Sequence, residues 1–228
     1  LKGDKLSEPN LNEFQDNQID KHTDDEVPSI AIIPFENKGA EEDVFYAYGI
    51  SADLISDCSG AGLIRVASKR DIEKLDYTKL DNTELSEKLF VRYIATGELW
   101  RMGDMFQLSV ELYDTKESKV IWSDRWQEKW DNLSSIKGNL SDGLLKSLDT
   151  TLKIKKKVET TNTEAYEYYL KAKYKYEKRE NTDDTEIARG LLNKAIELDD
   201  NLISAKVLLG TTYRAMSDYD EAMEIYTL

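Results

Sequence analysis

The sequence predicts an α/β domain followed by paired helices, and three patterns support this prediction. Residues 30–35 form a short, nearly continuous apolar run, which is typical of a strand covered on both faces. Residues 93–129 alternate between apolar and polar side chains, which is typical of antiparallel strands with one wet face. Beyond residue 161 the apolar pattern is helical throughout. We therefore expect a mixed sheet in the order β-α-β-α-β-β-β-α, followed by all-α helix pairs.

Composition divides the chain of 228 residues into four parts. Residues 1–27 carry eight acidic side chains against three lysines and are expected to be a flexible acidic tether. Residues 28–152 hold the α/β domain, and residues 153–161 are a charged linker with few apolar side chains. Residues 162–228 are expected to hold about one and a half helical repeats, because the second repeat stops at the last residue.

Charge and hydropathy limit the partners. The net charge of −14 repels a phosphate backbone, so nucleic acid is not expected as a partner of this chain. No stretch approaches the ~20 apolar residues that span a bilayer, so a membrane is expected only through a segment upstream. The acidic residues 1–27 resemble a stem leaving a membrane, which favours an extracytoplasmic (periplasmic) location over a cytoplasmic one.

Candidates for catalysis or metal binding are few. His22 is the only histidine and lies in the acidic tether, where no partner is fixed in space, so a solvated side chain is expected. Cys58 is the only cysteine, lies on an apolar helix face and is expected to act as a small hydrophobe. We expect no catalytic residue, metal ligand or cofactor here, and therefore no enzyme activity in this part of the protein.

The first helix is expected after residues 36–43, because apolar side chains recur there at steps of three and four: Ala47, Ile50, Leu54 and Cys58. Gly60 and Gly62 are expected to end it. Asp53 and Asp57 lie four residues apart and so face the same way. Two such carboxylates could bind a cation or serve acid–base chemistry. We favour a solvated surface opposite the apolar face, which is the common case.

The remaining elements of the α/β domain follow from the same kinds of pattern. Residues 63–67 are a second short strand, Ser68 is a candidate cap for a helical turn over 69–75, and a helix is expected to run from Asn82 or Thr83 to Leu89. Strands are expected over 93–101, 105–113 and 120–129, followed by a long amphipathic helix over 133–152 with Asn132 as its cap.

Three tryptophans, Trp122, Trp126 and Trp130, share the parity of the last strand. They could form a stacking platform for a ligand, but aromatic side chains of this size are more often core. We favour the core, with Trp130 at the edge of the domain.

Helical repeats are indicated by a period of 34 residues. Ala188 is followed by Ala222, and Leu192 by Tyr226, at that spacing. A 34-residue period of helix pairs is the tetratricopeptide signature, and Leu209-Gly210 with Tyr213 occupies the corresponding positions of a first helix. The first helix of the first repeat is expected over 163–179, and residues 181–184 are expected to lengthen the loop after it.

Tetratricopeptide arrays commonly bind extended segments of other proteins in the groove lined by their first helices. We expect Tyr168, Lys175, Thr211 and Arg214 to face such a groove and to contact a protein or peptide partner. The alternative is that two partial repeats only extend the solenoid.

Four segments in order resemble the TolB-like amino-terminal domain. They are residues 28–37 (PSIAIIPFEN), 45–55 (FYAYGISADLI), 91–99 (VRYIATGEL) and 121–126 (IWSDRW). Two residues depart from the family pattern: Tyr48 stands where an aspartate is frequent, and Trp126 where a tyrosine is frequent. A binding role of that aspartate, if the family has one, is therefore in doubt here.

The resemblance implies an accessory part of a bacterial signalling chain, because such modules usually follow a class III adenylate or guanylate cyclase domain or a winged-helix DNA-binding regulator. Our leading hypothesis is a non-catalytic module for ligand sensing or protein interaction, in which the α/β domain receives a small ligand or partner. The alternatives are the carboxy-terminal part of a cyclase, with its activity in another domain, and a cell-envelope assembly protein.

Overall fold

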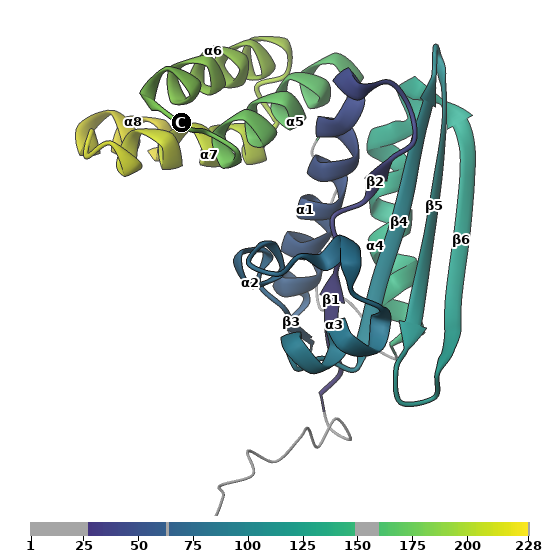
Figure 1. The fold of residues 1–228 in the computed structure, drawn as a ribbon. Coiled ribbons are helices and arrows are strands. Elements are labelled where there is room, and N and C mark those ends of the chain that lie inside the picture. The colour runs from purple at the N-terminus through teal and green to yellow at the C-terminus, as the bar shows by residue number, and fades with distance from the viewer. Residues whose placement is uncertain (1–26, 63, 149–159, 228) are drawn as a thin grey trace, which may run out of the picture.

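The fold was analysed in a computed structural model, which describes residues 27–62, 64–148 and 160–227 (Figure 1). Several predicted parts lie outside these ranges. They are the expected tether except its last residue, with His22, most of the expected linker, and the end of the helix predicted over 133–152. The described chain forms a sheet covered by helices, with further helices projecting to one side, so the predicted α/β domain followed by paired helices is confirmed.

The sheet is mixed, and its strand order is β3-β1-β4-β5-β6, with the short strand β2 paired to β4. Its strands are β1 (Ser29–Ile32), β2 (Glu36–Asn37), β3 (Arg65–Val66), β4 (Tyr93–Met102), β5 (Met105–Asp114) and β6 (Lys119–Lys129). β1 runs parallel to β3 and β4, whereas β4, β5 and β6 form an antiparallel meander. The strand expected over 30–35 is shorter and ends at Ile32, before Pro34, which has no N–H to donate to a ladder. The short strand β2 lies in residues 36–43, which were expected to be a polar loop.

Two layers of helices cover the sheet. On one face α1 (Val44–Ala61) and α4 (Leu133–Ser147) pack over the large core that includes Phe106 and Leu112. On the opposite side α2 (Lys69–Glu73) and α3 (Asn82–Leu89) cover a smaller apolar cluster centred on Ile72, Leu85 and Ile94. The part of β4 and β5 beyond α3 keeps a wet face, as the alternation predicts.

Several predicted helix ends are confirmed by their caps. Gly62 ends α1 in the left-handed conformation (φ 79°), which glycine adopts without a Cβ penalty. Ser68 caps α2 by accepting a hydrogen bond from the Asp71 backbone N–H. Asn132 is the N-cap residue of α4, as predicted, but it makes no capping hydrogen bond: its backbone is already helical, and its side-chain amide donates to Glu128 instead.

The register of β6 changes at a β-bulge. Leu112 pairs with Trp122, whereas the next residue, Tyr113, pairs with Val120, so Ile121 is inserted. Trp122 and Trp126 are half-buried against the core and Trp130 is buried, which confirms a core role. Trp130 also donates to Glu167 beyond the sheet, so it lies at the edge of the domain as expected.

The carboxy-terminal region consists of two helix pairs. α5 (Thr163–Glu177) packs on α6 (Thr182–Leu198), and α7 (Ile203–Ala215) packs on α8 (Tyr219–Thr227). The loop expected over 181–184 is wrong, because Asn181 caps α6 by accepting from the Asp184 backbone N–H at 3.0 Å and α6 begins at once. Within the described residues, no helix is both long and apolar enough to cross a bilayer.

The helix pairs join the α/β domain where α5 crosses α1. Gly49 lies at this crossing, and a Cβ built there would come within 2.6 Å of the Leu170 side chain. An alanine at this position would therefore require the buried Leu170 side chain to move.

This close approach makes a matched pair of substitutions informative. We expect Gly138→Ala, in α4 where an added Cβ meets nothing within 4 Å, to raise the free energy of unfolding by about 0.5–1 kcal/mol through helix propensity. We expect Gly49→Ala to lower it by about 1 kcal/mol, because overpacking costs about 1–3 kcal/mol. Urea unfolding followed by circular dichroism measures both, and an equal gain in the two variants would contradict the close approach.

Candidate functional site at the junction of α1 and α5

Helix α1 is buried on two sides, and its second buried side contacts α5. Ala47, Ile50 and Leu54 face the sheet as predicted. Tyr46, Gly49 and Asp53 recur at steps of three and four on another face, where each contacts an α5 residue. This second face is largely polar, so the junction is held by charges and hydroxyl groups as well as by apolar packing.

Asp53 is the centre of the junction, and only 3% of the residue is exposed. Its Oδ2 accepts from the Tyr166 hydroxyl at 2.9 Å, and its Oδ1 from the Tyr169 hydroxyl at 2.9 Å. Lys173 Nζ lies 2.6 Å from Oδ1, and Lys137 Nζ lies 3.0 Å from Oδ2. We call these five residues the Asp53 cluster. The prediction that Asp53 lies on a solvated face is wrong, because α5 covers the face of α1 that carries Asp53.

The charge of Asp53 is maintained by its two lysines. Burial alone would raise the pKa of this carboxyl, but the charges of Lys173 and Lys137 and their hydrogen bonds hold it well below its usual range. Burial and the neighbouring Asp53 carboxylate raise the pKa of Tyr166, which keeps its hydroxyl protonated as a donor. The cluster is therefore a satisfied buried network, which is costly to break by removing one member.

Asp57 lies one turn further along α1 and is less buried. Its side chain is 14% exposed, its Oδ2 accepts from the Ser141 hydroxyl at 3.2 Å, and Lys137 Nζ lies 3.9 Å away. Lys137 thus bridges the two aspartates of α1. The structure brings Asp53 and Asp57 to one place, as their spacing predicts, but with two ammonium groups beside them.

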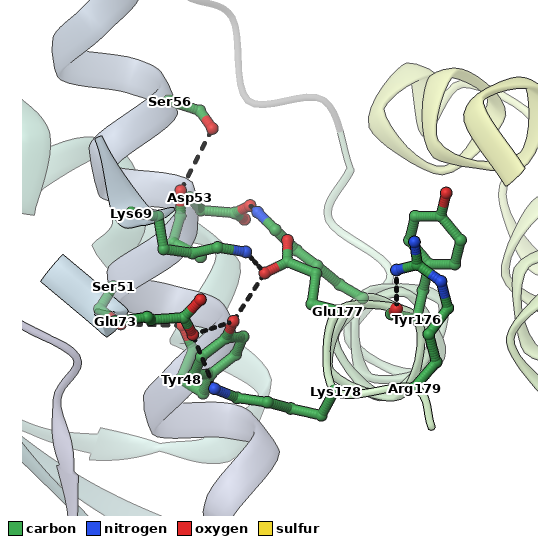
Figure 2. Close-up of polar contacts among 12 residues, drawn as sticks. Tyr48, Ser51, Asp53, Ser56, Lys69, Glu73, Tyr176, Glu177, Lys178 and Arg179 are labelled. Carbon is green, nitrogen blue, oxygen red and sulfur yellow. Dashed lines mark hydrogen bonds and ion pairs between the residues drawn. The ribbon is translucent and has the colours of Figure 1, made fainter. Parts of the chain in front are cut away.

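A second polar cluster joins α1 to both α2 and α5 (Figure 2). The Tyr48 hydroxyl lies 2.9 Å from Glu73 Oε1 and 2.7 Å from Glu177 Oε2, so its single proton can be donated to either carboxylate. Lys178 pairs with Glu73 at 2.7 Å, and Lys69 pairs with Glu177. The tyrosine that replaces an aspartate of the TolB-like pattern therefore connects three helices here.

A third set of contacts lies at the amino-terminal end of α1. Tyr46 donates to Glu167 Oε2 at 2.7 Å, and Trp130 donates to the other oxygen of the same carboxylate. Arg101 donates to the Tyr46 hydroxyl at 2.8 Å and lies over the Trp130 ring, 4.2 Å from its centroid. Contacts from α5 thus reach α1 and the turn before α4, and Arg101 of β4 contacts the same two aromatic side chains.

A cavity of about 310 Å³ opens beside the Asp53 cluster, between α1, α4, α5 and α7. Its polar wall includes Asp53, Asp57, Lys137 and Lys173, and its opposite wall consists of α7 side chains: Ile203, Ser204, Val207, Leu208 and Thr211. This volume is at the lower end of the range for small-ligand sites. The cavity is the place where the α/β domain and the second helix pair face one another.

A further cavity of about 630 Å³ lies on the wet side of the sheet, next to the turn after α2. Its lining includes Tyr77 and three carboxylates, Glu36, Glu98 and Glu111. Lys38 pairs with Glu36 at 2.7 Å and with Glu98 at 3.3 Å, so part of this acidic surface is already neutralised. Among the described residues, no group of three or more His, Cys, Asp or Glu is placed to hold a metal ion.

The predicted groove residues lie on α5 and α7. Thr211 lines the cavity of about 310 Å³. Tyr168 is half-buried beside Lys171, Lys175 forms an ion pair with Asp184 at 2.6 Å, and Arg214 is exposed in the last turn of α7. Their role in binding a peptide stays a prediction.

The residues that make the junction were missed in the sequence, although α5 carried a signal. Tyr166, Tyr169 and Lys173 recur at helical spacing, which places two hydroxyl groups and one ammonium group on a single face. Lys137 had no such pattern around it. Cys58 is fully buried, in agreement with its expected place on the apolar face.

Comparison of the sequence with known families identifies the α/β domain. Residues 25–143 match the second domain of HilA/YgeH-like transcriptional regulators, which is just over half of the chain. The chain belongs to this family. Its described part shows that the matched region contains the whole sheet, α1 to α3 and most of α4, while the helix pairs lie beyond it.

A curated relative extends the match into the helix pairs. The chain is 23% identical over 199 residues to a protein of Rhizobium meliloti (strain 1021) named putative adenylate cyclase 3. The match covers 84% of this chain and 33% of that protein, so the chain spans about a third of the relative's length. A domain of this kind therefore occurs in HilA/YgeH-like regulators and in an adenylate cyclase-like protein.

Three solved structures resemble part of the chain at low identity. TolB from Acinetobacter baumannii has a TM-score of 0.42 and 19% identity, covering 54% of this chain and 28% of its own. PelC from Paraburkholderia phytofirmans has a TM-score of 0.38 and 18% identity, covering 55% and 91%. Lipoprotein GNA1162 from Neisseria meningitidis has a TM-score of 0.38 and 16% identity, covering 54% and 99%.

The Asp53 cluster leads to a stability prediction with a defined pH dependence. We expect Asp53→Asn to lower the free energy of unfolding at neutral pH by about 3 kcal/mol, because it leaves the buried Lys173 ammonium group without its carboxylate and removes the nearer of the two carboxylates beside Lys137. The folded pKa of Asp53 is depressed below the unfolded value of about 3.9, so its contribution is complete above about pH 5 and is lost as the pH falls below about 4.

The difference between the wild-type chain and Asp53→Asn should therefore narrow in acid. Urea unfolding at a series of pH values measures it. Glu87→Gln, at an exposed position of α3, is the control and should change the free energy of unfolding by less than about 0.5 kcal/mol. A difference for Asp53→Asn that stays constant down to about pH 2 would contradict the buried ion pairs.

Proposed function

We propose that this chain is a non-catalytic module for ligand sensing and protein interaction in a bacterial signal-transduction protein, acting as a rigid joint between its α/β domain and its helix pairs. The observation that carries the proposal is the Asp53 cluster. A buried carboxylate with four partners from α4 and α5 makes independent movement of the two parts costly. A change at either part is therefore transmitted to the other.

The family indicates where such a module stands in a longer protein. HilA/YgeH-like regulators carry such a domain second in their chains, so an effector domain ahead of it is the arrangement we propose. Signals received by the α/β domain or the helix pairs would reach the effector through the chain that connects them. The module itself would supply contacts and no chemistry.

The helix pairs are proposed to be tetratricopeptide repeats that bind a protein or peptide. Ala188 and Ala222, separated by 34 residues, are both buried on the second helices of their pairs. Gly210 lies against the Tyr226 ring, which supports the same assignment because the helices of a pair need small residues where they touch. Thr211 and Arg214 on α7, with Tyr168 and Lys175 on α5, are the residues we propose for this contact.

A second candidate is the carboxy-terminal part of a nucleotide cyclase. It is favoured by the match to putative adenylate cyclase 3 over 84% of this chain. In this case the cyclase activity would belong to another domain of the full-length protein. The two candidates share the same role for this module and differ in the effector that it controls.

The joint is tested in the full-length protein. We expect Asp53→Asn to shift the effector output, measured as promoter activity or as cyclic nucleotide formed, by about tenfold or more, because loss of about 1.4 kcal/mol of coupling changes an equilibrium tenfold. Glu87→Gln should leave the output unchanged. Equal outputs from the wild type and a folded Asp53→Asn protein would rule out transmission through this joint.

The absence of catalysis is tested directly. The purified 228-residue chain, incubated with ATP or GTP and Mg²⁺, should form no cyclic nucleotide above the rate of a protein-free control. The full-length protein assayed in parallel distinguishes the two effectors. Turnover by the 228-residue chain alone would overturn the proposal that this module is non-catalytic.

A further inference from the structure

The cavity between α1 and α7 has two walls of opposite character. Ile203 and Val207 are 52% and 51% exposed, although both are aliphatic and lie toward a wall of charged groups. The facing wall holds two carboxylates and two ammonium groups, from Asp53, Asp57, Lys137 and Lys173. An occupant that fits both walls needs charged groups at one end and an aliphatic body at the other.

Surplus N–H donors on Lys173 point to an anionic group. Each lysine ammonium has three N–H donors, and a carboxylate offers about four acceptor sites. Asp53 already accepts from two tyrosine hydroxyls and two lysines, which fills its sites. Lys173, with a side chain only 10% exposed, therefore cannot give its remaining N–H groups to Asp53, and they can bind a ligand carboxylate instead.

The overall charge of the wall limits the ligand further. Two aspartates and two lysines sum to zero, and the group is largely removed from water. A ligand with a net charge would leave that charge uncompensated at a partly buried place, which is costly. Asp57 is the more exposed of the two aspartates, because 14% of its side chain is exposed against 3% for Asp53. We therefore assign the ligand ammonium group to Asp57.

We propose that this cavity binds a free α-amino acid with an aliphatic side chain. Its carboxylate would meet Lys173, its ammonium group would meet Asp57, and its side chain would pack on Ile203 and Val207. The volume of about 310 Å³ suits one such molecule and not an extended peptide. The inference rests on the proposed sensing function and names the ligand class of that site.

A bound amino acid would also connect the two parts of the chain. Its polar end would contact α1, α4 and α5, and its aliphatic end would contact α7 of the second helix pair. Binding therefore favours the arrangement in which α7 lies against α1, by as much as the ligand prefers that arrangement over others. The concentration of the amino acid would therefore influence how the α/β domain and the helix pairs are arranged.

The experiment is calorimetric titration of the 228-residue chain with L-leucine, up to about 10 mM, which would nearly saturate a site with a Kd of about 1 mM. Two analogues test the two charged groups. 4-Methylpentanoate lacks the ammonium group and isoamylamine lacks the carboxylate, and each should bind at least about tenfold more weakly, since each brings a net charge to a wall whose own charges sum to zero. Equal binding of either analogue would overturn the amino-acid assignment.

A matched pair of variants locates the site. Val207→Glu places a carboxylate on the α7 wall and should weaken L-leucine binding at least about tenfold by repulsion and lost apolar contact. Val120→Glu makes the same change at a position 46% exposed on β6, outside the cavity lining, and should leave the affinity unchanged. Both variants are expected to fold, because each changes a half-exposed side chain, and circular dichroism checks this.

The outcomes separate this inference from the proposed function. If L-leucine, L-isoleucine and L-valine all fail to bind, the amino-acid site is wrong. A change of effector output in Asp53→Asn would then still support the joint. If L-leucine binds but Asp53→Asn leaves the output of the full-length protein unchanged, the site stands and transmission through the joint is wrong.

Discussion

A buried carboxylate is the central contact between the two parts of this chain. Asp53 belongs to α1, the helix that carries the core of the α/β domain, yet all four of its partners come from α4 and α5. An uncompensated charge at this depth is costly, so the folded state requires α5 to be docked. The position of the helix pairs relative to the sheet follows from this requirement.

Most of the α/β domain could be predicted because its patterns are local. Alternation in β4 and β5, the αL glycine after α1 and the Ser68 cap each depend on residues close together in the sequence. The errors also have local causes. Pro34 has no N–H to donate, so the first strand is shorter than expected, and the helical backbone of Asn132 accompanies the absence of a capping hydrogen bond from its side chain.

The junction could not be predicted, because it depends on contacts between residues more than a hundred positions apart. Asp53 pairs with Tyr166, Tyr169 and Lys173, and nothing near Asp53 in the sequence indicates that α1 is covered on a second side. An aspartate opposite an apolar helix face is usually solvated, and that usual case misled the prediction. The stripe of hydroxyl and ammonium groups on α5 was visible, but its partner was not.

The outer strand of the sheet has a consequence for how this protein behaves in a crowded cell. β6 is eleven residues long and ends the strand order, so within the described chain one side of its backbone is open to another strand. Its exposed positions include Lys119, Asp124 and Arg125, and the inserted Ile121 bends the ladder. Such charges and bulges discourage edge-to-edge aggregation, so copies of the domain can be held at high local concentration without joining their sheets.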